Sequence, residues 1–487
     1  MPSWILLIIA FLPIVGGALI GLIKNNFKLT KILSYTVVIL TSIATWLAIF
    51  LIKEDKFLIL EIVKNYEICL KFDNFGKVFA GMVSILWPLA LMYSFGYMKH
   101  DARKQTYNMF YVMTFGVVLG LAFSENLLTM FCFYEMLTFI TLPLIVHPAT
   151  SEARKAGRFY LYFSLSGSSL SLVGMILITS FLGTNSFELA FGSTASANML
   201  FQMGYLLCFF GFGVKSAIFP LHFWLPMAGA APTPTTALLH AVAVVKAGLF
   251  ALLRVTFYNR GAYYISGTAI QYVVMIIACV TIIYGSAKAL KEQHLKRRFA
   301  YSTISNLSYI VLALSFMNYI GLIAALIHLV MHSVTKICLF FVCGEVIENS
   351  EAKYVYQLDG FAKKMPLTFI AYTLAACSIT GVPLFAGFVS KYYIISAGLE
   401  LGNVFSLIGI ICLILSAIMT AVYSLQISFK AFVNKPNQLG EEVYKRANEK
   451  SKEMLIPICV FAIVCVILGV SSTWFVDLLM NLFNLRG

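Results

Sequence analysis

Charge is scarce in this chain of 487 residues. Asp, Glu, Lys and Arg together make up 11% of it, whereas a soluble domain holds about 25%. Hydrophobic residues account for 60%, and apolar runs of about 20 residues recur from end to end. The runs lack the alternation of a transmembrane barrel. The sequence therefore predicts an all-α protein that crosses a membrane many times.

Paired cysteines are also absent. None of the ten cysteines forms a CxxC pair, and nearly all fall within apolar runs. They predict neither an iron–sulfur or zinc site nor a disulfide framework, so we expect no cofactor in this chain. The segment GFGVKS resembles the end of a phosphate-binding loop, but Val214 precedes Lys215 where that loop requires glycine. No basic flank of a signal peptide precedes the first apolar run.

The apolar runs divide the chain into about 14 predicted membrane-spanning helices. Their ranges are 4–23, 30–52, 75–98, 107–124, 126–146, 158–182, 199–219, 232–256, 264–288, 299–316, 319–343, 366–397, 404–429 and 454–473.

Basic residues are distributed unevenly between the loops. The odd-numbered loops carry 23 of them, including Lys24 and Lys450, and the even-numbered loops carry seven, including Lys64 and Arg254. The positive-inside rule makes the odd loops cytoplasmic and places both termini on the outer side of the cytoplasmic membrane. The net charge of +14 thus reflects topology, and we expect no nucleic-acid partner.

One stretch combines features that lipid does not tolerate. It runs from Gly211 to Arg254 and reads GFGVKSAIFPLHFWLPMAGAAPTPTTALLHAVAVVKAGLFALLR. Four prolines interrupt it, and it holds Lys215, His240 and Lys246. Irregular backbone and ammonium groups persist at membrane depth only where they are buried in protein or line a wet cavity. The stretch therefore indicates part of an ion path.

Five charged residues lie inside the predicted spans. Each costs about 2.5–3.5 kcal/mol at mid-membrane, so these side chains have to face the protein interior, where they are paired, hydrated or neutral. Four lysines against one glutamate leave some lysines without a carboxylate, and such a lysine can exchange a proton near neutral pH. A structural role is the alternative for each of them. They are Glu135, Lys215, Lys246, Lys336 and Lys391.

The segment HLVMHSVTK adds two histidines to Lys336. The spacing of four places His328, His332 and Lys336 on one helix face. Because histidine titrates near neutral pH, this pattern predicts a proton relay. A metal site is the alternative, although no third ligand is evident. His240 is a possible further member of the relay or a core histidine.

The range 366–397 repeats the features of the range 199–219. It is interrupted at Gly381-Val382-Pro383 and carries one lysine, Lys391. Two broken helices five spans apart predict two inverted five-helix repeats with discontinuous helices 7 and 12. We divide the chain into three N-terminal helices (1–104), a first repeat that takes up protons (105–260), a second repeat that releases them (261–431), and a loop with the last helix (432–487).

Several segments resemble one membrane-protein family over essentially the whole chain. This family comprises the antiporter-like subunits shared by respiratory complex I, Mrp-type Na⁺/H⁺ antiporters and energy-converting membrane-bound hydrogenases. The matching segments are ENLLTMFCFYEMLT, GVKSAIFPLHFWLPMAGAAPTPTTALLHAVAVVKAGLFALLR, YSTISNLSYI, HLVMHSVTKICLFFVCG and GVPLFAGFVSKYYI.

The resemblance implies a role for each charged residue. Glu135 corresponds to the glutamate that pairs with Lys215, and Lys246 to the central lysine. His328, His332 and Lys336 correspond to the relay, and Lys391 to the exit residue, which is glutamate in some members. About fourteen residues follow the last predicted span. We therefore expect the chain not to be the largest complex I member, which carries a long lateral helix there.

The resemblance also implies a function in a complex. We expect proton translocation, with Na⁺/H⁺ exchange left open, by one subunit of a redox-driven complex that resembles complex I or a membrane-bound hydrogenase. The expected partners are other membrane subunits of the family, a bundle of small helical subunits and a peripheral redox arm with Fe–S, flavin or Ni–Fe groups. The alternatives are a subunit of an Mrp-type antiporter without redox chemistry and a non-conducting membrane scaffold.

Overall fold

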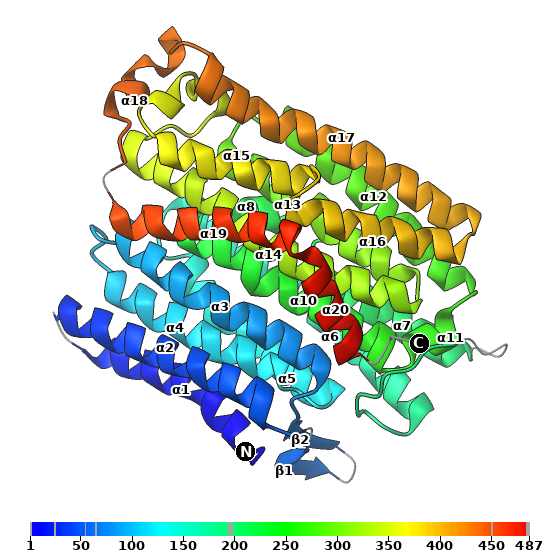
Figure 1. Ribbon diagram of the computed structural model, residues 1–487. Helices are drawn as coiled ribbons and strands as arrows, with labels where there is room; N and C mark the ends of the chain where they lie inside the picture. Colours follow the sequence, from blue (N-terminus) through cyan, green and yellow to red (C-terminus); the bar gives the residue numbers. More distant parts are fainter. Residues whose placement is uncertain are drawn as a thin grey trace.

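Long helices that run side by side make up most of the molecule (Figure 1). The computed structural model describes residues 2–23, 26–53, 55–63, 66–192, 198–449 and 451–483. Lys24, Lys64, Lys450 and Arg486 are among the basic residues of the sequence, but they lie outside the described residues.

Within the described residues, the first half of the chain contributes seven helices before the broken stretch. These are α1 (Ile5–Leu22), α2 (Phe27–Leu51), α3 (Asn74–Tyr97), α4 (Lys104–Ala122), α5 (Leu127–Ile145), α6 (Ser151–Leu182) and α7 (Met199–Gly213).

The second half contributes the helices that follow the broken stretch. These are α11 (Gly261–Ile265), α12 (Ala269–Lys291), α13 (Leu295–Ser315), α14 (Tyr319–Ser350), α15 (Pro366–Thr380), α16 (Ala386–Leu401), α17 (Val404–Val433), α18 (Glu441–Arg446), α19 (Lys452–Val470) and α20 (Ser472–Leu482).

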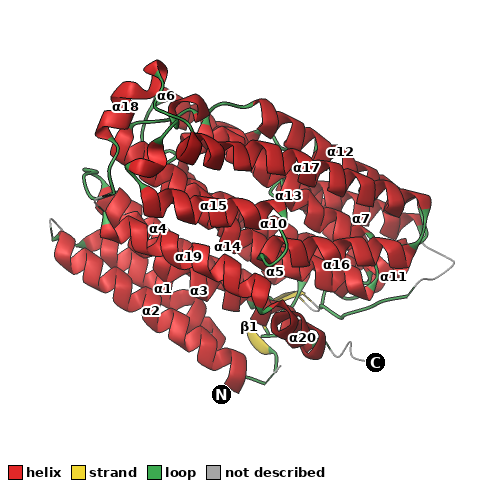
Figure 2. Ribbon diagram, turned by 45° about the horizontal axis from the view of Figure 1, so that its top comes forward, coloured by secondary structure: helices red, strands yellow, loops and turns green. Residues whose placement is uncertain are grey.

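The predicted helical membrane architecture is confirmed in its main features. Among the described residues, ten helices are long and apolar enough to cross a membrane by length and composition. The remaining predicted ranges hold α4, α7, α13 and the pair α15 and α16. The first and last described helices begin and end at the same end of the bundle (Figures 1 and 2).

A β-hairpin corrects the expectation of a purely helical fold. Strands β1 (Phe57–Val63) and β2 (Tyr66–Leu70) pair antiparallel, with Phe57 opposite Leu70. It lies at the end of the bundle where the chain begins (Figure 2). The sequence FLILEIV has the composition of a strand, but charged residues surround it and it is too short to span. Hydropathy alone therefore assigns this segment to a loop.

Two spans form the centre of the bundle. In the segment Thr233–Tyr258 and in α14, every residue of the most apolar part is buried, whereas in the other eight spans only 33–72% of it is. Lipid therefore has little access to these two spans. They carry His240, Lys246 and the α14 face with His328, His332 and Lys336, so these polar side chains are shielded by protein, as the cost of charge in a bilayer requires.

The broken stretch departs from regular helix several times. After α7 the chain is irregular until α8 (Trp224–Met227), and the following span combines α9 (Thr233–Ala237), a π-helix η2 (Leu238–Val242), α10 (Val244–Leu253) and a second π-helix η3 (Arg254–Tyr258). π-Helical turns occur mostly at functional sites. Here they bracket the segment that carries Lys246.

The second predicted interruption lies between α15 and α16. Gly381 ends α15 with φ +91°, a left-handed conformation that favours glycine. A Cβ atom on Gly387 would lie 1.8 Å from the carbonyl oxygen of Ser378. The start of α16 therefore packs directly against the end of α15, at a separation that only glycine permits.

The sequence predicts Arg254 in a loop, but it lies in η3 inside the bundle. Its guanidinium is fully buried and forms an ion pair with Asp73, in which Nη2 donates to Oδ1 over 2.8 Å. The rings of Phe75, Phe187, Phe250 and Tyr258 surround the guanidinium at 4.7–5.0 Å. The bidentate carboxylate of Asp73 and the aromatic rings together compensate for the water that the buried guanidinium has lost.

We expect Asp73→Asn to lower the free energy of unfolding by about 3 kcal/mol, because it leaves a buried guanidinium without its counter-charge. Asparagine retains the volume and the cap that Asp73 provides to Gly76 at the start of α3. Thermal unfolding in mild detergent, followed with a dye that reacts with newly exposed cysteines, measures the change.

The matched control is Glu188→Gln, which removes the charge partner of Arg260. Those two side chains are 69% and 43% exposed, so their pair contributes under about 1 kcal/mol. Equal unfolding temperatures for the two variants would contradict the structural role of the buried pair.

Candidate functional site

The predicted pair of Glu135 and Lys215 is present. Glu135 lies on α5 and accepts a hydrogen bond from Ser168 of α6. The Lys215 Nζ atom lies 4.0 Å from Glu135 Oε1, and it donates to the backbone oxygen of Tyr134 over 2.5 Å. Lys215 is fully buried, and its Nζ atom lies 3.3 Å from the centroid of the Tyr134 ring. A carbonyl, a ring and a more distant carboxylate therefore share the ammonium.

Lys215 takes this place because α7 ends two residues before it. Beyond the helix end the chain turns sharply, and Trp224 closes the turn by donating from Nε1 to the Val214 oxygen over 2.8 Å. α10 then packs against the turn. A Cβ atom on Gly248 would lie 2.7 Å from the Ser216 nitrogen and 3.0 Å from the Lys215 carbonyl carbon. Gly248 thus brings the helix of Lys246 against the segment of Lys215.

A line of buried side chains begins at Lys246. Its Nζ atom lies 2.8 Å from His332 Nδ1, and an ammonium can only donate, so the imidazole nitrogen accepts. The rings of His332 and His328 are 5.7 Å apart between centroids. His328 Nδ1 lies 2.8 Å from the hydroxyl of Ser390 on α16. The next residue along that helix is Lys391.

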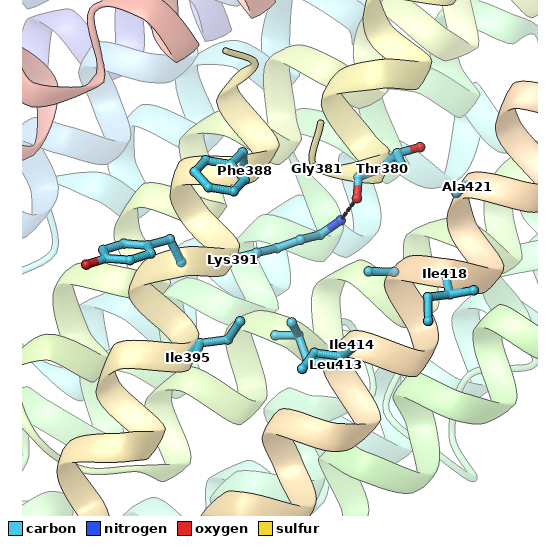
Figure 3. A pocket seen from close by; sticks show the side chains of 11 residues that line it. Thr380, Gly381, Phe388, Lys391, Ile395, Leu413, Ile414, Ile418 and Ala421 are labelled. Carbon is cyan, nitrogen blue, oxygen red and sulfur yellow. Dashed lines mark hydrogen bonds between the residues drawn. The ribbon is translucent and has the colours of Figure 1, made fainter. Parts of the chain in front are cut away.

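Lys391 is bound to the end of the broken helix. Its ammonium donates to the backbone oxygen of Thr380 over 2.5 Å (Figure 3) and to that of Ile379 over 2.8 Å. The last carbonyls of a helix lack partners within it and carry its negative dipole end, so they stabilise a cation. The side chain also lines a cavity of about 380 Å³ together with Phe388 and Ile414.

Lys336 and His240 lie beside this line. Lys336 donates to the backbone oxygen of Phe299 over 3.1 Å, and it is within electrostatic range of Lys246 and His332. His240 is fully buried, and within the described part of the chain neither of its ring nitrogens has a hydrogen-bond partner. The structure therefore buries seven of the eight predicted side chains and leaves Glu135 18% exposed, but it joins only some of them directly.

Several polar contacts of this site were not predicted. Ser168 and Ser390 each hydrogen-bond a predicted residue, and Gly248 sets the approach of α10. A serine in an apolar run changes the mean hydropathy little, so the hydropathy pattern does not single out Ser390. Only its position one residue before Lys391 could have pointed to it. Glu345 and Lys296 are also buried, although the predicted spans ended before Glu345 and began after Lys296.

The alternative of a metal site finds no support among the side chains that can be placed. Within the described ranges, no group of three or more His, Cys, Asp or Glu residues could hold a metal ion.

Comparison with known proteins identifies a family. The family model described as NADH:quinone oxidoreductase/Mrp antiporter, TM, matches residues 124–420. The chain is similar to the Na⁺/H⁺ antiporter A1 subunit of Staphylococcus haemolyticus (31% identity over 431 residues, 83% of this chain and 52% of the relative). It is also similar to a probable K⁺/H⁺ antiporter component of Rhizobium meliloti (29% identity, 82% of this chain and 40% of the relative). The chain thus spans about half the length of these curated relatives.

Two solved structures share the fold along nearly the whole chain. One is the Mrp complex from Dietzia sp. DQ12-45-1b, with a TM-score of 0.86, 20% identity, and coverage of 99% of this chain and 98% of that one. The other is the membrane-bound sulfane sulfur reductase, an archaeal respiratory membrane complex, with a TM-score of 0.84, 24% identity, and coverage of 98% and 96%. Both are multi-subunit membrane complexes.

We expect Gly248→Ala to lower the free energy of unfolding by about 1–3 kcal/mol, because the new methyl group has to displace backbone of Lys215 and Ser216. Thermal unfolding in detergent measures this change. Gly229→Ala is the control, since its Cβ would meet only Lys296 at an ordinary 3.8 Å. If both variants were as stable as the original chain, α10 would not be packed tightly against the turn.

Proposed function

Since this chain belongs to the NADH:quinone oxidoreductase/Mrp antiporter transmembrane family, we propose that it carries protons across a membrane as one antiporter-like subunit of a larger complex. The observation that carries the proposal is the buried line from Lys246 through His332 and His328 to Ser390, with Lys391 the next residue on α16 and within electrostatic range of His328. The side chains along this line can both accept and donate protons. They lie at membrane depth, where ionisable groups without partners are otherwise excluded.

The topology of the proposal follows the sequence. Fourteen segments cross the membrane, and two inverted five-helix repeats at 105–260 and 261–431 each contribute one of the two buried central spans. The odd-numbered loops are cytoplasmic, and both termini lie on the outer side of the cytoplasmic membrane. The broken helices α7 and α15–α16 then occupy corresponding places in the two repeats.

The first step takes place at the pair of Glu135 and Lys215. A proton arrives from the cytoplasmic side and charges Lys215, and Glu135 stabilises the charged form while the two groups are close. Their separation of 4.0 Å exceeds a direct hydrogen bond, so a small displacement of the carboxylate changes the strength of the pair. When the carboxylate moves away, the neutral amine is favoured and the proton passes on.

The second step is transfer along the central line. Lys246 gives its proton to Nδ1 of His332, whose other ring nitrogen releases a proton towards His328 by way of water. His328 passes it through the Ser390 hydroxyl to Lys391, the last residue of the line. The backbone oxygens of Ile379 and Thr380 stabilise the charged Lys391 before it releases the proton to the outer side.

We expect Lys215→Met and Glu135→Gln each to abolish coupled proton transport while the protein still folds and assembles. The first variant removes the group that carries the proton, and the second removes the charge that controls it. Transport is measured with a pH-sensitive dye inside liposomes that contain the reconstituted complex. Lys445→Met, which removes a lysine 71% exposed, is the control and should transport normally.

The same variants test the scaffold alternative. A non-conducting scaffold predicts that the buried charges are structural, so their removal would reduce the amount of assembled complex. If the complexes assembled and both variants transported protons at the full rate, the proposed function would be wrong.

The partner complex is proposed from the family and the resemblance. We favour a redox-driven complex, in which Fe–S, flavin or Ni–Fe groups lie in a peripheral arm and this chain binds none of them. Other family members and a bundle of small helical subunits would complete the membrane part. The named Na⁺/H⁺ and K⁺/H⁺ antiporter relatives favour the second candidate, an Mrp-type antiporter that couples proton movement to an alkali cation.

Purification of the tagged chain in mild detergent distinguishes the two candidates. A redox-driven complex should bring along subunits with iron–sulfur or nickel signals in absorption and electron paramagnetic resonance spectra. An Mrp-type antiporter should bring along only colourless membrane proteins. In that second case, the original complex should exchange Na⁺ or K⁺ for protons in liposomes.

A further inference from the structure

A second cavity opens at one end of the bundle, away from the proposed path. It has a volume of about 570 Å³ and lies between the starts of α2 and α19 and the ends of α3 and α14. This end carries odd-numbered loops, which the proposed topology makes cytoplasmic. Its polar lining includes Lys31, Lys99, His100, Glu348, Asn349 and Glu453.

A buried carboxylate lies one helical turn inside this cavity. Asn349, which lines the cavity, donates from Nδ2 to Glu345 Oε1 over 2.7 Å. Glu345 is fully buried, and within the described part of the chain its Oε2 atom has no hydrogen-bond partner. Buried carboxylates in a purely structural role have both oxygens satisfied, because an unpaired one is costly. This residue therefore needs an explanation that the proposed path does not provide.

Further polar groups lie near Glu348, which is itself within electrostatic range of Glu345. Lys296 is buried and donates to the backbone oxygen of Ala231 over 3.0 Å. It is within electrostatic range of Glu348 in the cavity on one side and of His240 on the other. His240 in turn is within electrostatic range of Lys336.

His240 is suited to connect these groups. It lies on the π-helical turn η2, both of its ring nitrogens are unpartnered in the described structure, and Lys336 already interacts with His332 of the central line. An imidazole can take up a proton on one nitrogen while it releases one from the other. Titratable groups are thus present at each stage between the open cavity at the end of α14 and Lys336 further along the same helix.

We propose that this cavity is a second cytoplasmic inlet, through which protons reach Lys336 by way of Glu345, Lys296 and His240 without passing Glu135 or Lys215. This inference rests on the proton transport proposed above. In it, the pair of Glu135 and Lys215 supplies the coupling, and the second inlet supplies the proton that the α14 relay hands on. Loss of Lys215 therefore stops transport but leaves proton exchange at Glu345 intact.

Infrared difference spectroscopy of the complex in liposomes tests access to Glu345 directly. We expect a protonated carboxyl band that shifts when H₂O is replaced by D₂O and that is missing in Glu345→Gln. A bulky, membrane-impermeant thiol reagent should slow this shift when it labels Glu348→Cys from the cavity side. The chain without that new cysteine, treated with the same reagent, is the control. A band that does not exchange, or that exchanges equally fast after labelling, would overturn the inlet.

Transport measurements test whether the inlet is used. Glu345→Gln should slow proton transport by about tenfold or more, as expected for the loss of a proton-transferring group, and Glu345→Asp should restore part of the rate. Glu441→Gln changes an exposed acid of the α18 segment and should transport normally. Full transport by Glu345→Gln alone counts against the inlet, whereas full transport by Lys215→Met counts against the proposed function itself.

Discussion

A charged side chain in a bilayer has to find its partners within the protein, because lipid provides none. The architecture of this chain follows from that requirement. Lys215 and Lys391 both lie beside a helix end, and both ammonium groups donate to backbone oxygens. A regular helix uses its carbonyls internally, so an interrupted helix is the cheapest source of free ones. The interruption between α15 and α16 therefore provides the acceptors for Lys391, whereas Lys215 follows the end of α7 and donates to the Tyr134 oxygen within α5.

The buried charged side chains differ in how many groups stabilise them. This number distinguishes charges that stabilise the fold from charges that are suited to transfer protons. Arg254 has a two-pronged carboxylate and four surrounding rings, and guanidinium does not release its proton in proteins. Lys246 has one neutral imidazole as its hydrogen-bond partner. A proton can leave Lys246 without stranding a buried counter-charge, whereas the pair of Arg254 and Asp73 locks one span to the start of α3.

Both proposed proton routes meet on the central helix α14. This helix is buried along its apolar length, carries His328, His332 and Lys336 on one face, and ends beside a cavity at Glu345. One helix thus contributes both to the line that leads to Lys391 and to the proposed second inlet. Rearrangement around α14 would affect both routes together, which offers a physical basis for coupling them.

The sequence by itself determined the membrane class, the approximate positions of the helices, both interruptions and which ionisable side chains lie within the spans. These follow from local quantities: the length of an apolar run, the effect of proline and glycine on the backbone, and the cost of a charge in lipid. The tertiary structure alone decided the burial of Arg254 and Glu345, the β-hairpin, and the contacts of Ser168, Ser390 and Gly248. Those features depend on contacts between segments distant in the chain, which no local pattern records.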